Sequence, residues 1–217
     1  MVMIMEKKYT HIIWDFNGTI LDDLDACIES VNILLENHGL RRLPDTETYR
    51  RAFGFPVRDY YERIGFDFNK TPYDELAIEW VNLYLEYTKE PILTDGVARI
   101  LGYNRELGKE QLVLSACEIE MLTSQLEQLG VKEFFTEIIG LSNIHAAGKG
   151  DLARVWREKH PDAEVLYIGD TVHDYEVATI LDADCALYTG GHHDRERLEA
   201  CGVAVFDDFR ELEKIIK

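Results

Sequence analysis

The sequence lacks long apolar runs, patterned cysteines and excess basic charge. No apolar stretch approaches the roughly 20 residues that a transmembrane helix needs, so we expect no membrane span. The four cysteines, Cys27, Cys117, Cys185 and Cys201, have neither metal-ligand nor redox spacing. Because disulfides are rare in reducing compartments, we interpret these residues as free thiols of a cytoplasmic protein.

Basic residues are scarce: 23 Lys and Arg stand against 41 Asp and Glu, for a formal net charge of −18 at pH 7. This balance argues against a broad basic face that binds nucleic acid or an anionic membrane, so we expect neither as a partner. An anionic substrate must then be held locally. A divalent cation, one or two basic side chains and the amides of a helix N-terminus can do this in a small pocket.

Internal repeats and low-complexity segments are also absent. The chain has 217 residues, of which 46% are hydrophobic and 29% charged, a composition typical of a globular protein with a substantial core. This length exceeds the usual domain of about 100–150 residues. We therefore expect one large domain, or a domain with an insertion.

Short apolar segments alternate with helical patterns from residue 94 onward. After a first buried strand at His11–Trp14, the expected strands are Gln111–Ser115, Glu137–Gly140, Val165–Gly169, Cys185–Tyr188 and Val203–Phe206. Strands that alternate with helices of this length are typical of a parallel sheet covered on both faces. The sequence thus predicts an α/β fold with a doubly wound, Rossmann-like parallel sheet.

The stretch between the first two strands has a helical pattern throughout. One helix is expected near residues 24–37, short helices over residues 41–69, and a longer helix with Thr71 as its N-cap and Pro72 at its first position. The apolar face of that longer helix is interpreted as core: Leu76, Trp80, Leu83, Tyr84 and Tyr87. We therefore predict an inserted helical cap domain at residues 22–91 and a Rossmann-like core made of residues 1–21 and 92–217.

Carboxylates follow two of the predicted strands directly. Asp15 comes immediately after His11–Trp14, and Gly18 allows the close turn that follows. Asp170 and Asp174 come after Val165–Gly169. Ligands bind at the carboxyl ends of strands in open α/β sheets, so the chemistry is expected where these residues meet.

These residues resemble the motifs of the haloacid dehalogenase (HAD)-like hydrolase superfamily. Asp15-Phe16-Asn17-Gly18-Thr19 resembles motif I, whose usual form is Asp-any-Asp-Gly-Thr, and the run from Ile168 to Asp174 resembles motif IV. Ser115 and Lys149 match motifs II and III in order and spacing. The resemblance covers essentially the whole chain. It points to the subclass with a helical cap between motifs I and II, and within that subclass to the phosphoglycolate phosphatase group.

The resemblance implies a Mg²⁺-dependent phosphoric monoester hydrolase that acts on a small phosphorylated metabolite, as a monomer or homodimer. Asp15 would be the nucleophile that forms an aspartyl-phosphate. The implied metal ligands are Asp15, the backbone carbonyl of Asn17, Asp170 and Asp174. Lys149 would pair with Asp15 and the phosphoryl group. Phosphoryl oxygens would be held by Gly18, Thr19, Ser115 and Ala116, together with Lys149.

Asn17 departs from the family pattern, because the usual phosphatases have an aspartate there that acts as acid and base. General acid–base catalysis contributes about 10²–10⁴-fold to the rate, and a carboxamide cannot provide it. Three explanations stay open. The substrate carries a good leaving group such as an acyl phosphate; another group, such as His145 or a cap residue, substitutes; or catalysis is weakened and the protein binds Mg²⁺ with a phosphorylated ligand or a partner protein.

Two further possibilities are weighed against simpler interpretations. A phosphonatase-like C–P hydrolase would need a cap lysine that forms a Schiff base, and the predicted cap contains only Lys70 and Lys89. His192-His193-Asp194 could bind a transition metal, but we interpret these residues of a Gly-Gly loop as solvated. Arg50, Arg51, Arg58 and Arg63 are candidates for recognising an anionic substrate tail.

Overall fold

Six parallel strands form one sheet in the order β3-β2-β1-β4-β5-β6 in the computed structural model, which describes residues 9–141 and 148–217. His145 lies outside the described residues. The strands are β1 (His11–Trp14), β2 (Glu110–Glu118), β3 (Glu137–Leu141), β4 (Val165–Gly169), β5 (Asp184–Tyr188) and β6 (Ala204–Phe206). The predicted doubly wound α/β sheet is therefore confirmed.

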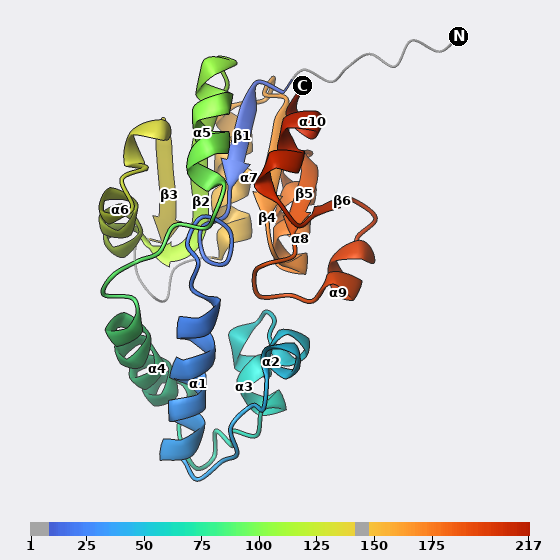
Figure 1. Cartoon of the computed structure of the whole chain (residues 1–217). Coiled ribbons are helices and arrows are strands. Elements are labelled where there is room, and N and C mark those ends of the chain that lie inside the picture. The colour runs from blue at the N-terminus through green and yellow to red at the C-terminus, as the bar shows by residue number, and fades with distance from the viewer. Residues whose placement is uncertain (1–8, 142–147) are drawn as a thin grey trace.

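Helices cover both faces of this sheet (Figure 1). One face packs against α5 (Val97–Glu106), α6 (Ile119–Gln128) and α10 (Leu212–Ile216), and the other against α7 (Lys149–Lys159), α8 (Val172–Ile180) and α9 (Arg195–Glu199). Two short 3₁₀ helices are η1 (Lys132–Phe134) and η2 (Phe209–Glu211). Successive side chains of a strand point to opposite faces, so Ile12 and Trp14 join the first core and Ile13 the second.

Four helices lie together beyond the carboxyl ends of the strands (Figure 1). They are α1 (Leu24–Asn37), α2 (Thr46–Ala52), α3 (Val57–Arg63) and α4 (Tyr73–Tyr87). Their buried side chains form a third core, separate from the two sheet cores, and include Val31, Leu35, Tyr60 and Leu76. We call α1–α4 the helical layer.

Two details of the predicted α4 are wrong. Thr71 is not its N-cap: the helix begins at Tyr73, and the capping residue is Pro72, which makes no side-chain cap hydrogen bond. Tyr87 is 45% exposed rather than part of the core. Helix periodicity places Tyr87 on the apolar face, but at the last turn the layer no longer covers that face.

The chain passes between sheet and helical layer twice, and the two connectors lie side by side. Leu21 and Leu93 form an antiparallel bridge. The Asp22 amide donates to the carbonyl of Ile92 at 2.9 Å, and the Thr94 amide donates to the carbonyl of Ile20 at 2.9 Å. The domain boundaries at residues 21/22 and 91/92 stay a prediction.

None of the helices in the described parts of the chain combines the length and the apolar character needed to cross a bilayer.

Candidate active site

Three carboxylates meet where β1 and β4 end. The two strands pair in parallel, with Trp14 beside Ile168, and the Asp15 amide donates to the Ile168 carbonyl at 2.8 Å. This register brings Asp15 to Asp170 and Asp174, and one oxygen of each carboxylate lies within 4.8 Å of the others. All three side chains are buried. Buried carboxylates this close repel one another and need cationic partners.

Lys149 lies between two of these carboxylates. It is the first residue of α7, and its Nζ donates to Asp15 Oδ1 at 2.5 Å and to Asp174 Oδ1 at 2.6 Å. Burial alone would lower the pKa of the lysine, but the two anions outweigh it and raise the pKa above its usual range. Lys149 is therefore a fixed ammonium ion that links β1, α7 and α8.

The two carboxylates that contact Lys149 have different environments. Burial and the charge of Asp174 raise the pKa of Asp15 to about 6, although Lys149 opposes the shift. Burial also opposes ionisation of Asp174, yet Lys149 and Thr171 hold its pKa below the usual value. The Thr171 amide and hydroxyl donate to Asp174 Oδ2 at 2.9 and 2.7 Å in the capping box of α8. Asp174 thus has a structural as well as an electrostatic role.

The residues predicted to hold phosphoryl oxygens lie around this cluster. β2 does not end at Ser115 as expected, but continues to Glu118 with a register shift against β3 between Leu114 and Glu118. Ser115 lies in that irregular segment, buried, and its Oγ accepts from the Cys117 amide at 3.0 Å, while Ala116 is exposed. The register shift interrupts the regular pairing of β2 with β3 in this segment. Its role in binding phosphate stays a prediction.

Gly18 and Thr19 support the carboxylates directly. The Thr19 hydroxyl donates to Asp170 Oδ1 at 3.0 Å, and the Gly18 amide donates to Asp23 Oδ1 at 2.8 Å. Gly18 has φ of 70°, and a Cβ there would lie 2.5 Å from Asp170 Oδ2, so both the turn and the close approach require glycine. Their role in binding phosphate stays a prediction.

A second buried polar group surrounds Asn17, and sequence reasoning did not identify it. The Asn17 amide nitrogen donates to Asp23 Oδ2 at 2.8 Å and to the Tyr84 hydroxyl at 2.9 Å, and that hydroxyl donates to Asp23 Oδ2 at 2.8 Å. His192 Nε2 lies 3.2 Å from Asp23 Oδ1. Burial opposes the charge of Asp23, but His192, Asn17 and Tyr84 hold its pKa below the usual value.

The expectation that His192 and His193 are solvated is wrong. They are 4% and 1% exposed. The His192 amide donates to Asp170 Oδ2 at 2.7 Å, and its Nδ1 lies 3.0 Å from the Tyr49 hydroxyl. The Val172 amide donates to His193 Nδ1 at 3.0 Å. The helical layer covers this loop, which the local Gly-Gly sequence does not reveal.

Hydrogen bonds also join the helical layer to the loop after β5. Arg50 of α2 donates to the carbonyls of Gly191 and Gly190 at 2.8 and 2.7 Å. Arg197 of α9 donates to the carbonyls of Arg50 and Phe53 at 3.0 and 2.8 Å. Arg50 is thus engaged within the protein rather than free to recognise a substrate. These contacts close the helical layer over the carboxylate cluster.

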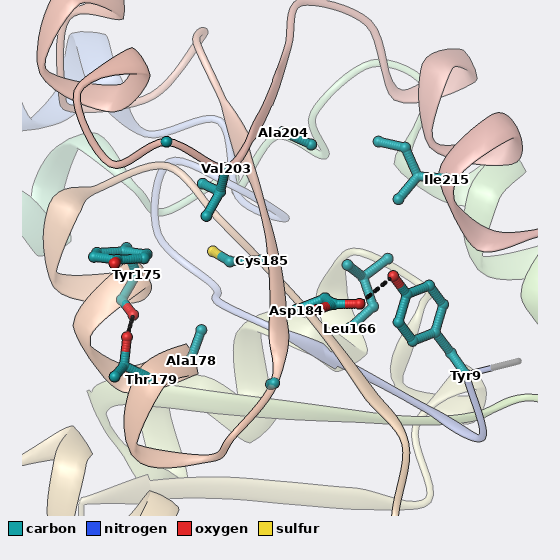
Figure 2. Close-up of a pocket in the computed structure, with 12 residues that line it drawn as sticks. Tyr9, Leu166, Tyr175, Ala178, Thr179, Asp184, Cys185, Val203, Ala204 and Ile215 are labelled. Carbon is teal, nitrogen blue, oxygen red and sulfur yellow. Dashed lines mark hydrogen bonds between the residues drawn. The ribbon is translucent and has the colours of Figure 1, made fainter. Parts of the chain in front are cut away.

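A pocket of about 350 Å³ lies away from this cluster (Figure 2). It is lined by the first residues of β5 and β6, Asp184 and Ala204, and by Leu166 near the start of β4. The Tyr9 hydroxyl donates to Asp184 Oδ2 at 2.7 Å at its edge. This is the amino-terminal edge of the sheet, opposite the edge of Asp15. None of the predicted site residues lines it.

The chain is similar in sequence to known hydrolases. The family model of haloacid dehalogenase-like hydrolases matches residues 12–187. The phosphoglycolate phosphatase of Synechococcus elongatus is 25% identical over 191 residues, 87% of this chain and 88% of that protein. The phosphoglycolate phosphatase of Caulobacter vibrioides is 26% identical over 172 residues, 75% of this chain and 72% of that protein.

The fold also matches a solved structure. The crystal structure of a predicted phosphatase from Clostridium acetobutylicum superimposes with a TM-score of 0.77 at 22% identity, covering 96% of this chain and 98% of that one. At this identity the likeness concerns the fold alone.

Proposed function

The chain belongs to the haloacid dehalogenase-like hydrolases, and from this premise we propose that it is a Mg²⁺-dependent phosphatase that acts through an aspartyl-phosphate on a small phosphorylated metabolite. The observation that carries the proposal is the buried contact of Lys149 with Asp15 and Asp174 beside Asp170. The two relatives, both named phosphoglycolate phosphatase, support a small, negatively charged phosphorylated substrate.

Asp15 is the proposed nucleophile. Its carboxylate oxygen attacks phosphorus, the bond from phosphorus to the leaving oxygen breaks, and the electron pair leaves with that oxygen. Water then attacks the phosphorus of the aspartyl-phosphate and regenerates the Asp15 carboxylate. Two steps with an enzyme-bound intermediate replace one difficult displacement.

The carboxylate cluster fits a Mg²⁺ ion. Mg²⁺ prefers hard oxygen ligands, and the cluster offers Asp15 and Asp170, whose buried charges repel each other. We propose that these two carboxylates and the Asn17 carbonyl hold the ion, with Asp174 bound directly or through water. When bound, the ion neutralises negative charge on the attacking and transferring groups.

Lys149 and the amides of β2 complete the proposed phosphate site. Lys149 lowers the repulsion between the anionic nucleophile and an anionic substrate, and it stabilises charge that spreads over the phosphoryl oxygens during transfer. Ser115 and the exposed Ala116 lie in the irregular segment of β2, the strand that pairs with β1, and we propose that their donors orient those oxygens.

The helical layer is the proposed cap, with boundaries at residues 22–91. The catalytic side chains are buried, so a substrate enters only when the layer moves away from the sheet. The paired connectors at Leu21 and Leu93 are the proposed hinge. Closure then excludes water from the reaction.

A phosphate-release assay over a panel of phosphorylated metabolites, with and without Mg²⁺, tests this proposal. Asp15→Asn serves as the blank, because the amide keeps the side-chain shape and removes the nucleophile. We expect Mg²⁺-dependent release in the wild type and a loss of at least about 10³-fold in the variant. Unchanged turnover in Asp15→Asn would exclude the proposed mechanism.

Asn17 supports a second candidate, a protein of this fold that binds Mg²⁺ and a phosphorylated ligand, or a partner protein, without efficient turnover. Calorimetric binding of inorganic phosphate in the presence of Mg²⁺, with no release from any substrate, would favour it. The phosphonatase alternative gains no support, because Lys70 and Lys89 are exposed and pair with Asp67 and Glu86.

A further inference from the structure

We infer that this site selects phosphates whose leaving group departs without taking up a proton, above all acyl phosphates. The inference rests on the proposed phosphatase function and narrows its substrate class. It follows from which hydrogen-bond donors around Asn17 are already used by other groups of the protein. A leaving oxygen needs a donor with a free proton, and the described residues at this place offer none.

The carboxamide of Asn17 has no donor left. A primary amide has two N–H groups, and these go to Asp23 Oδ2 at 2.8 Å and to the Tyr84 hydroxyl at 2.9 Å. Asp23 accepts hydrogen bonds, so the nitrogen and not the oxygen must face it. Asn17 Oδ1 is therefore the atom left over, and it can only accept.

Asp23 and Tyr84 are equally committed. The Tyr84 hydroxyl gives its one proton to Asp23 Oδ2 at 2.8 Å. Asp23 receives donors on both oxygens, from Asn17, Tyr84 and the Cys27 thiol on Oδ2 and from the Gly18 amide and His192 on Oδ1. A buried carboxylate with five such partners is an acceptor for its neighbours, not a proton source.

The two cationic candidates face other groups. His192 contacts Asp23 through Nε2 and the Tyr49 hydroxyl through Nδ1, so both ring nitrogens are occupied. Lys149 Nζ gives two of its three N–H groups to Asp15 and Asp174, at the carboxylate cluster rather than in the polar group around Asn17. Among the described residues, the polar groups around Asn17 donate their hydrogen bonds to one another. We infer that none of them protonates a leaving oxygen.

The chemistry that remains is balanced without an acid. Asp15 attacks the phosphorus of an acyl phosphate, the bond from phosphorus to the acyl oxygen breaks, and the electron pair leaves as a carboxylate. Water then cleaves the aspartyl-phosphate, and both of its hydrogens end on the phosphate product. A carboxylic acid has a pKa of about 4, so its carboxylate can leave without taking up a proton. An alkoxide is far too basic to leave in this way. General acid help would be worth about 10²–10⁴-fold for the latter.

The test is the dependence of kcat/KM on the pKa of the leaving group. The probes are acetyl phosphate, a series of substituted phenyl phosphates and, as the alkyl member, 2-phosphoglycolate, each with Mg²⁺ and with Asp15→Asn as the blank. We expect a steep fall in kcat/KM as the leaving group becomes more basic. A flat dependence in the wild type would overturn the inference and leave the phosphatase function intact. Release no greater than the blank on every probe would overturn both.

An exchange variant sharpens the test. Asn17→Asp combined with Asp23→Asn swaps carboxylate and carboxamide while one donor still faces one acceptor across the 2.8 Å contact. We expect kcat/KM to rise by about 10²–10⁴-fold for 2-phosphoglycolate and to change little for acetyl phosphate. The matched single variant Asp23→Asn should keep the steep dependence. A selective loss on alkyl phosphates in that variant would identify Asp23 as an acid and overturn the inference.

Discussion

At the scale of single residues, Lys149 decides whether the buried carboxylates are tolerated. It is 3% exposed and contacts Asp15 and Asp174. Its ammonium group compensates two charges that the surrounding core cannot solvate. Removing one member of a buried ion pair leaves an uncompensated charge, which is far more costly than losing an exposed pair.

Lys149→Met should therefore lower the free energy of unfolding by about 3–5 kcal/mol. The control is Lys132→Met, which removes the Lys132–Glu127 pair at 2.5 Å, where both side chains are exposed. That change should cost no more than about 1 kcal/mol. Urea denaturation of both variants without Mg²⁺ makes the comparison. Equal losses would contradict the account of Lys149 as the charge that compensates the cluster.

At the scale of elements, the irregular pairing of β2 with β3 shapes the segment that carries Ser115. Gly140 of β3 lies against it: a Cβ at this position would be 2.8 Å from the Cys117 carbonyl oxygen and 3.0 Å from Ile119 Cα. Both neighbours are backbone atoms, which cannot rotate away as a side chain can. The two strands approach this closely only because residue 140 has no side chain.

Gly140→Ala should destabilise the protein by about 1–3 kcal/mol, the usual range for overpacking. Gly102→Ala is the matched control, because it lies in α5 with nothing within 4 Å of the new Cβ. That change should be neutral or stabilise by up to about 1 kcal/mol, since alanine is the better helix former. Thermal unfolding of the two variants provides the readout. A neutral Gly140→Ala would show that β3 moves away freely.

At the scale of the whole molecule, negative charge dominates. The net charge of −18 produces a potential that attracts cations generally. The cluster of Asp15, Asp170 and Asp174 adds three buried carboxylates at one point, against one lysine. A general attraction and a specific site differ in one respect: only the site responds to the loss of a single ligand.

Mg²⁺ should raise the melting temperature more than NaCl of the same ionic strength. A ligand at 100 times its dissociation constant stabilises by about 2.7 kcal/mol, and each kcal/mol is worth about 2–4 °C for a chain of this size. Asp170→Asn keeps the side-chain shape and removes one proposed ligand, so most of the shift should disappear. If Mg²⁺ raised the melting temperature of Asp170→Asn as much as that of the wild type, the stabilisation would come from general screening of charge.

Much of the architecture could be predicted from local sequence. β1 and β4 have the predicted bounds, and each is followed by the acid that the motif required. The failed predictions for the site concern how a segment packs against the rest of the protein. Ser115 was expected at a strand end, yet β2 continues through a register shift to Glu118. His192 and His193 were expected in solvent, yet the helical layer buries them.

The sequence by itself determined that Asp15 and Asp170 meet, because parallel strands of alternating βα units end at one edge of the sheet. Only the tertiary structure decided the surroundings of Asn17. Its partner Asp23 is itself bonded to Tyr84, 61 residues away, and to His192, 169 residues away. Periodicity marked Tyr84 as core, and no local pattern shows which hydroxyl a packed helix brings to which carboxylate. Such contacts depend on how the helical layer packs on the sheet, which is set by whole surfaces rather than by neighbouring residues.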